Sequence, residues 1–140
     1  YEQAFNVMRR LRLPYSQAQE MFRRIAFNVV VRNQDDHTKN ISFLMDSSGQ
    51  WSLSPAYDMG FAYNPLGAWT ATHQMSINGK FDNITRADLL SLANANNIKN
   101  ASEIIDQVCE TTAGWPELAK NCGVPQKMID GIVPHMFLNI

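Results

Sequence analysis

Several features that define specialised protein classes are scarce in this chain of 140 residues. Its two cysteines, Cys109 and Cys122, lack CxxC or CxxH spacing and are too few for a disulfide framework. No apolar run approaches the ~18–20 residues of a membrane span, and no charged-then-apolar leader opens the chain. The net charge is only −1, which gives no sign of general nucleic-acid binding. We therefore expect a soluble, cytoplasmic protein with two free, buried thiols.

The residues that are present suit one compact domain. Hydrophobic residues make up 45% and charged residues 18% of the chain, enough apolar material for a core. Residues 1–40 carry an excess of basic side chains and the remainder an excess of acidic ones. This basic excess fits either attraction of a phosphate-bearing ligand or a solvated helix face. The chain starts without an initiator Met and already reads as helix, so we expect a piece of a longer protein.

A helix is predicted from about residue 16 to residue 31. Its start carries a capping pattern. The Ser16 hydroxyl can accept a hydrogen bond from a backbone N–H of the first turn, and the Gln19 side chain can reach back to the Ser16 backbone N–H. The first ten residues form a further amphipathic pattern. Apolar side chains within 16–31 recur at helical spacing and define a buried face: Phe22, Ile25, Ala26, Val29 and Val30.

The most polar stretch of the chain, residues 32–40, follows this helix. Short strands are predicted at 41–45 and 51–53, joined by a turn. The segment 54–60 comes next. Because a hairpin brings its two ends together, the polar segments on either side of it can converge on one point.

The rest of the chain is predicted to be an ordered irregular loop over 61–81 followed by helices. Thr85 with Asp88 forms a capping signal for the first of them. The fold class is therefore mainly α (α+β), with one short β-hairpin. The three tryptophans are expected to pack the core, with a substrate groove as the alternative for Trp69. The remaining helices are placed at about 102–112, from Pro116 to Gly123, and from Pro125 toward Ile140 with a kink at Pro134.

Three polar residues of the loops beside the hairpin carry candidate chemistry: Asp35, Asn40 and Asp58. Two carboxylates and an amide oxygen suit an octahedral Mg²⁺ whose shell is completed by phosphate oxygens. A carboxylate beside that metal can receive the proton of an attacking hydroxyl. Lys39 can add a positive charge for the developing phosphate charge. The residue types therefore favour phosphoryl transfer.

The segment Asn33–Asn40 (NQDDHTKN) followed by Ser54–Asp58 (SPAYD) resembles the HipA-like serine/threonine kinases. These are the toxins of bacterial toxin–antitoxin pairs, a family associated with persistence. The resemblance extends through Met75–Lys80 and Gly114–Ala119 and covers nearly the whole chain. It implies that residues 1–140 are a single kinase-like C-terminal lobe. The Asp-x-His-x-x-Asn pattern is also similar to lipid kinases of the phosphatidylinositol type, a more distant relation.

The resemblance assigns roles to individual residues. Asp35 matches the catalytic aspartate, and Asn40 and Asp58 match the Mg²⁺ ligands. Asp58 opens a triplet in which Met replaces the Phe of the usual DFG. Supporting or phosphate-contacting roles fall to the other polar residues of the motif: Asp36, His37 and Lys39.

The resemblance also implies a reaction and partners. ATP would be the substrate, with Mg²⁺, and the acceptor a serine of a target such as an aminoacyl-tRNA synthetase. A HipB-like helix-turn-helix antitoxin would neutralise the kinase and bind operator DNA, so contact with DNA would be indirect, and no membrane is implied. The chain has no Gly-rich loop and no strand lysine, so we expect the N-terminal lobe upstream of Tyr1 and little activity of this part alone.

Two other classes of function remain open from the sequence. The same carboxylates could activate water in a metal-dependent phosphohydrolase. The chain could instead be a non-catalytic pseudokinase or an interaction module. For His37 a loop-organising hydrogen bond is favoured over metal binding, because no second His or Cys stands nearby at ligand spacing. His73 and His135 are interpreted as structural or surface residues.

Overall fold

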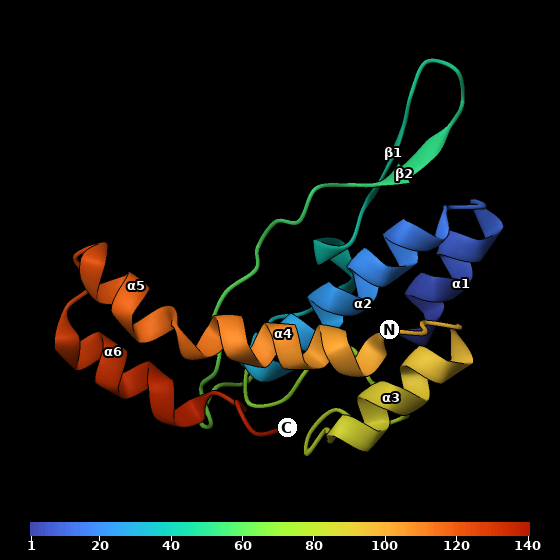
Figure 1. Cartoon of the computed structure of the whole chain (residues 1–140). Helices are drawn as coiled ribbons and strands as arrows, with labels where there is room; N and C mark the ends of the chain where they lie inside the picture. The colour runs from blue at the N-terminus through green and yellow to red at the C-terminus, as the bar shows by residue number, and fades with distance from the viewer.

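The computed structural model describes residues 1–140 and is mainly α-helical with one small antiparallel hairpin, as the sequence predicts (Figure 1). Between the hairpin and the third helix the chain is irregular. None of the helices is long and apolar enough to cross a membrane. In chain order the helices and strands are α1 (Glu2–Arg10), α2 (Tyr15–Val30), β1 (Phe43–Met45), β2 (Trp51–Leu53), α3 (Arg86–Ala95), α4 (Ala101–Ala113), α5 (Trp115–Asn121) and α6 (Gln126–Ile132), with short 3-10 helices at Thr38–Asn40 and Val133–His135.

The core is organised around α2, which lies against α4 (Figure 1). Phe22 and Ile25 of α2 and Ile104 of α4 are fully buried. Each such side chain stabilises the fold by about 1.5–3 kcal/mol through removal from water. The second half of α2 therefore lies in the core and fixes the position of the polar segment that follows the helix.

The start of α2 differs from the prediction. The helix begins at Tyr15 after Pro14, whose φ of −67° and ψ of 156° make it the N-cap. No side chain caps the first turn, so the predicted Ser16 cap is wrong. Proline's fixed φ prepares the helical entry without a hydroxyl acceptor. The end of the helix agrees with the prediction within one residue.

The start of α3 confirms the prediction from Thr85 and Asp88. The Thr85 side chain accepts from the Asp88 backbone N–H, and the Asp88 carboxylate accepts from the Thr85 backbone N–H, a complete capping box. The last helix is shorter than predicted. It ends at Ile132, where the chain tightens into a 3-10 turn containing Pro134. Proline cannot donate the next helical hydrogen bond, so it ends the helix rather than kinking it.

The hairpin projects away from the helices (Figure 1). Phe43 pairs with Leu53 and Met45 with Trp51. Leu44, Met45 and Trp51 are all exposed. None of the three tryptophans is buried, so the expectation that they pack the core is wrong. Cys122 is exposed and Cys109 half-buried, so the prediction of two buried thiols is wrong as well.

Candidate functional site

The polar segment that follows α2 begins with a reversal of chain direction at Arg32. Its φ of +56° lies in the left-handed region, which costs a non-glycine residue about 1 kcal/mol. The Arg32 guanidinium carbon lies 3.6 Å from the ring centre of Tyr63 and 4.6 Å from that of Phe137. These cation–π contacts offset the backbone cost. The backbones of Asn33 and Ala62 then form a short parallel bridge, which fixes the start of the segment.

Asp35 and Asn40 are joined within this segment. The side-chain nitrogen of Asn40 donates to the backbone carbonyl of Asp35 at 3.0 Å. With its nitrogen engaged, the amide group of Asn40 leaves its oxygen as the free acceptor. Asp35 is half-buried, and its carboxylate accepts no hydrogen bond from the chain. It can therefore accept a proton from a bound hydroxyl.

Asp58 lies on the segment after the hairpin, which is hydrogen-bonded to the first segment at two points. The Tyr57 hydroxyl donates to the Lys39 carbonyl at 2.6 Å. The Asn33 side-chain nitrogen donates to the Asp58 carbonyl at 3.2 Å. Asp58 is exposed, with a left-handed φ of +55°, and its carboxylate has no partner in the chain. A strained, unpartnered aspartate at this place is typical of a functional position.

The donor chemistry of these loops fits Mg²⁺. Asp58 offers a carboxylate and Asn40 an amide oxygen, the hard oxygen ligands that Mg²⁺ accepts. No group of three or more His, Cys, Asp or Glu side chains lies close enough to hold a metal ion. A cation here would therefore complete its shell with water or phosphate oxygens, as Mg²⁺ usually does.

Asp36, the residue after Asp35, has a different environment. It is fully buried at 0% exposure. Its carboxylate accepts from the Tyr1 hydroxyl at 2.5 Å, lies 2.8 Å from Nδ1 of His73, and accepts from the Gln74 backbone N–H at 2.7 Å. Of the two roles that the sequence left open for Asp36, burial favours support over phosphate contact.

The contacts of Asp36 continue through a set of buried side chains that we call the buried polar network: Tyr1, Asn28, Asn33, Asp36 and His73. The Asn28 side-chain nitrogen donates to the Tyr1 hydroxyl at 2.9 Å, and the Asn33 nitrogen donates to the Asn28 oxygen at 3.0 Å. Burial raises the pKa of the Tyr1 phenol well above its usual value, and the charge of Asp36 adds to the effect. The phenol therefore stays protonated and able to donate.

The two other motif residues make no side-chain hydrogen bonds in the chain. Lys39 is exposed, and its side chain is free to reach a ligand. His37 is half-buried, and its Nδ1 is buried without a hydrogen-bond partner. The loop-organising hydrogen bond predicted for His37 is not formed by that nitrogen.

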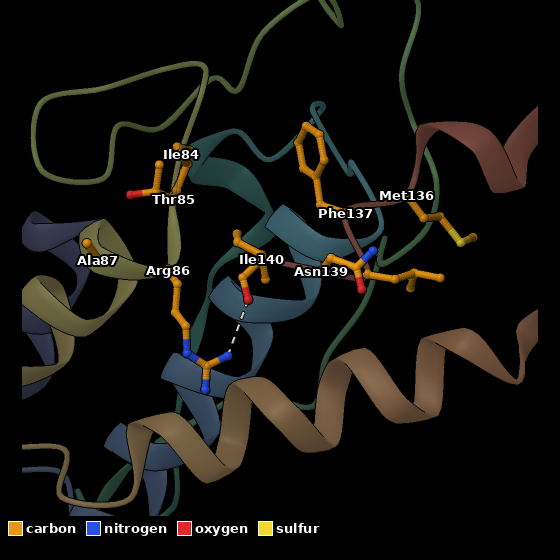
Figure 2. A pocket seen from close by; sticks show the side chains of 9 residues that line it. Ile84, Thr85, Arg86, Ala87, Met136, Phe137, Asn139 and Ile140 are labelled. Carbon is orange, nitrogen blue, oxygen red and sulfur yellow. Dashed lines mark hydrogen bonds between the residues drawn. The ribbon is translucent and has the colours of Figure 1, made fainter.

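Two pockets of the chain differ in their distance from the candidate residues. One pocket of about 650 Å³ is formed by the start of α3 and the last five residues, and none of the candidate residues lines it (Figure 2). Arg86 reaches across it to the Ile140 carbonyl at 3.3 Å. A second pocket of about 570 Å³ is nearer to the site, because its lining includes Tyr1, Thr38 and Gln74.

Sequence reasoning missed the partners of Asp36. Tyr1 and His73 lie 35 and 37 residues from it along the chain. The sequence predicts His73 to be a structural or surface residue, and its burial at 3% exposure confirms the structural alternative without having revealed the partner. No local spacing links these residues to Asp36, so no signal in a single sequence could have found them.

Comparisons with known proteins identify the same family as the motif in the two loops. Neither a search of curated proteins nor a search of solved structures gave a match. A scan of protein-family models matched residues 1–115 to the HipA-like C-terminal domain. The match covers both candidate loops, α1 to α4 and the hairpin, and leaves most of α5 and all of α6 outside. The chain therefore belongs to the family of HipA-like C-terminal domains.

Proposed function

We propose that this chain is the catalytic lobe of a HipA-like protein serine/threonine kinase. One observation supports this most. The carboxylates of Asp35 and Asp58 are both unpartnered and lie on two segments that are hydrogen-bonded to each other. The Asn40 amide oxygen is free on the same segment as Asp35. Phosphoryl transfer requires a positioned base and metal ligands near one point.

Each residue has a distinct role in the proposed reaction. Asp35 orients the acceptor serine hydroxyl and takes its proton as the oxygen attacks the γ-phosphorus, while the bond to the β–γ bridging oxygen breaks and ADP leaves. Asn40 and Asp58 would hold Mg²⁺, which supplies positive charge against the phosphate oxygens when bound. Lys39, exposed on the same loop, is placed to add a further positive charge.

The nucleotide site would be completed by the lobe expected upstream of Tyr1. The hairpin supports this view, because Leu44, Met45 and Trp51 leave apolar surface uncovered on a two-stranded element that is marginal alone. The chain by itself would then transfer little or no phosphate.

The proposed acceptor and antitoxin rest on the resemblance to HipA-like toxins. The chain's membership of the HipA-like family fits a toxin–antitoxin context. The acceptor would be a serine of a target such as an aminoacyl-tRNA synthetase. A HipB-like antitoxin would neutralise the kinase in the cytoplasm and link it indirectly to operator DNA.

The proposed function is tested on the intact parent protein. We would incubate it with Mg²⁺ and γ-labelled ATP beside two variants, Asp35→Asn and the control Asp46→Asn in the exposed hairpin turn. We expect label on protein serine in wild type and control, and a loss of about 10²–10⁴-fold in Asp35→Asn. Free labelled phosphate without labelled protein would indicate a phosphohydrolase. No transfer by any of the three proteins would favour a pseudokinase.

A further inference from the structure

We infer that Asp36 is a positioning residue that fixes Asp35 and Asp58 relative to each other through the buried polar network. The inference rests on the proposed function, because it assigns a task to a residue that does not touch the reacting atoms. Its basis is the geometry around Asp36 and the path of hydrogen bonds that leads from it to Asp58.

The orientation of Asp35 depends on its neighbours. Its own carboxylate has no hydrogen-bond partner in the chain, so no hydrogen bond fixes its orientation. The backbone on both sides of it is held instead. In the orientation that satisfies its amide group, Gln34 donates to the carbonyls of Thr70 and Ala71 at 2.9 and 3.0 Å. On the other side, Asp36 is fixed by its three partners.

The second half of the inference is the path to Asp58. From the Asp36 carboxylate, hydrogen bonds of 2.5, 2.9 and 3.0 Å connect Tyr1, Asn28 and Asn33. A bond of 3.2 Å then joins Asn33 to the Asp58 carbonyl. All four side chains of this path are buried, at 7% exposure or less. Away from water such bonds strengthen one another and are costly to break singly.

The path ends on the residue whose backbone is strained. Asp58 holds its left-handed φ of +55°, and the Asn33 nitrogen that binds its carbonyl is fixed in turn by Asn28. Strained conformations persist only where surrounding contacts determine them. Removal of the Tyr1 hydroxyl breaks the link between Asp36 and Asn28, so it would loosen both the hold on Asp36 and the support of Asn33 at the Asp58 backbone.

Asp88 provides a matched control. It too is a buried carboxylate, and it accepts from Asn78, Lys80 and the backbone and hydroxyl of Thr85. Its partners all lie within residues 78–88, and none of them is hydrogen-bonded to Asp35, Asn40 or Asp58. Asn78 is connected to the chain start only through its backbone N–H, which donates to Glu2 and does not depend on Asp88. If buried carboxylates act only through stability, Asp36 and Asp88 should behave alike. If Asp36 positions the site, only Asp36 should change the turnover rate.

The experiment measures transfer of labelled phosphate to protein serine by the intact protein. It compares wild type with Asp36→Asn, Tyr1→Phe and Asp88→Asn, at a temperature where circular dichroism shows all four folded. We expect kcat to fall about 100-fold in Asp36→Asn, since an error of about 1 Å in placement has that cost. Tyr1→Phe keeps the ring and should lose about tenfold, with the KM for ATP changing less than kcat in both. Asp88→Asn should stay within about twofold of wild type.

The possible failures are distinguishable. If wild type transfers label and Tyr1→Phe and every folded Asp36 variant keep kcat within about twofold, the positioning role is refuted while the proposed function stands. The positioning role is also refuted, and the proposed function stands, if Asp88→Asn loses as much turnover as Asp36→Asn. If wild type transfers no label, the proposed function fails and the inference fails with it. Should Asp36→Asn not fold, Tyr1→Phe alone decides, because it removes one hydroxyl and no charge.

Discussion

Asp35 and Asp36 are neighbours in the sequence and opposites in the structure. The carboxylate of Asp35 is half-exposed and has no partner in the chain, whereas that of Asp36 is fully buried among three donors. The same contrast separates two regions. One is the set of half-buried or exposed loop residues, which we call the open face: Asp35, Lys39, Asn40 and Asp58. The other is the buried polar network of Tyr1, Asn28, Asn33, Asp36 and His73.

The contrast shows how one short segment can serve chemistry and architecture together. A carboxylate without partners is free to take up a proton or a cation, but nothing holds it in place. A buried carboxylate with hydrogen bonds to both oxygens is not accessible to a ligand and can fix the backbone. Because Asp36 directly follows Asp35 in the chain, the fixed backbone of Asp36 also limits the movement of Asp35. The predictions below separate these properties, starting with the largest expected effect.

The largest effect is expected in stability. Asp36→Asn replaces one carboxylate oxygen by an NH2 donor. This donor then faces either the Gln74 backbone N–H at the Oδ1 position or Tyr1 and His73 at the Oδ2 position. We expect a loss of about 3 kcal/mol in the free energy of unfolding. Asp35→Asn should stay within about 0.5 kcal/mol of wild type, because no contact is lost. Urea unfolding followed by circular dichroism measures both, and equal losses would remove the contrast between the two aspartates.

The next effect concerns the open face. Asp58→Ala in the intact protein should weaken Mg²⁺-dependent nucleotide binding about 100-fold, equivalent to about 2.7 kcal/mol. Asp35→Asn should bind nucleotide within about threefold of wild type while losing transfer. Calorimetric titration with and without Mg²⁺ measures the affinity. Asp46→Ala, in the exposed turn of the hairpin, serves as the control and should bind normally.

Asp88 extends the comparison to a second buried carboxylate. Its hydrogen bond from Lys80, followed by those from Asn78 and Thr85, holds its pKa well below the ordinary value. A lowered folded-state pKa stabilises the fold above the unfolded value and loses that effect as pH falls through the folded one. Asp88→Asn should therefore cost about 2 kcal/mol at pH 7, and the difference from wild type should shrink below about pH 4. Urea midpoints across this pH range test it, and a difference independent of pH would contradict the assignment.

The smallest effect is expected at the contact between the two loops. Tyr57→Phe removes the hydrogen bond to the Lys39 carbonyl. Because this bond is partly solvated, we expect a loss of about 0.5–1 kcal/mol. Tyr63→Phe is the matched control, since it keeps the ring that stacks on Arg32 and removes a hydroxyl that makes no hydrogen bond in the chain. Thermal unfolding of both variants measures the difference, and a larger loss in Tyr63→Phe would count against the contact.

Local rules explain where the sequence predicted the fold well. The capping box of Thr85 and Asp88 and the apolar face of α2 depend on residues three or four positions apart. Predictions failed where several local signals competed. Pro14 took the place that Ser16 was expected to fill, and Pro134 ended α6 early. Burial of the tryptophans failed because hydrophobic character alone does not specify which apolar residues reach the core.

The sequence by itself determined the order of elements, the polar loops on either side of the hairpin and the motif that resembles HipA-like kinases. Local hydrogen bonding and periodicity are encoded within a few residues, so they can be read directly. Only the tertiary structure decided which aspartate of the pair 35–36 is open and which is buried. That decision depends on Tyr1 and His73, which reach Asp36 from distant parts of the chain when α2 and the irregular segment pack together. Burial of a charge is stable only where such donors converge, and their convergence is a property of the folded chain.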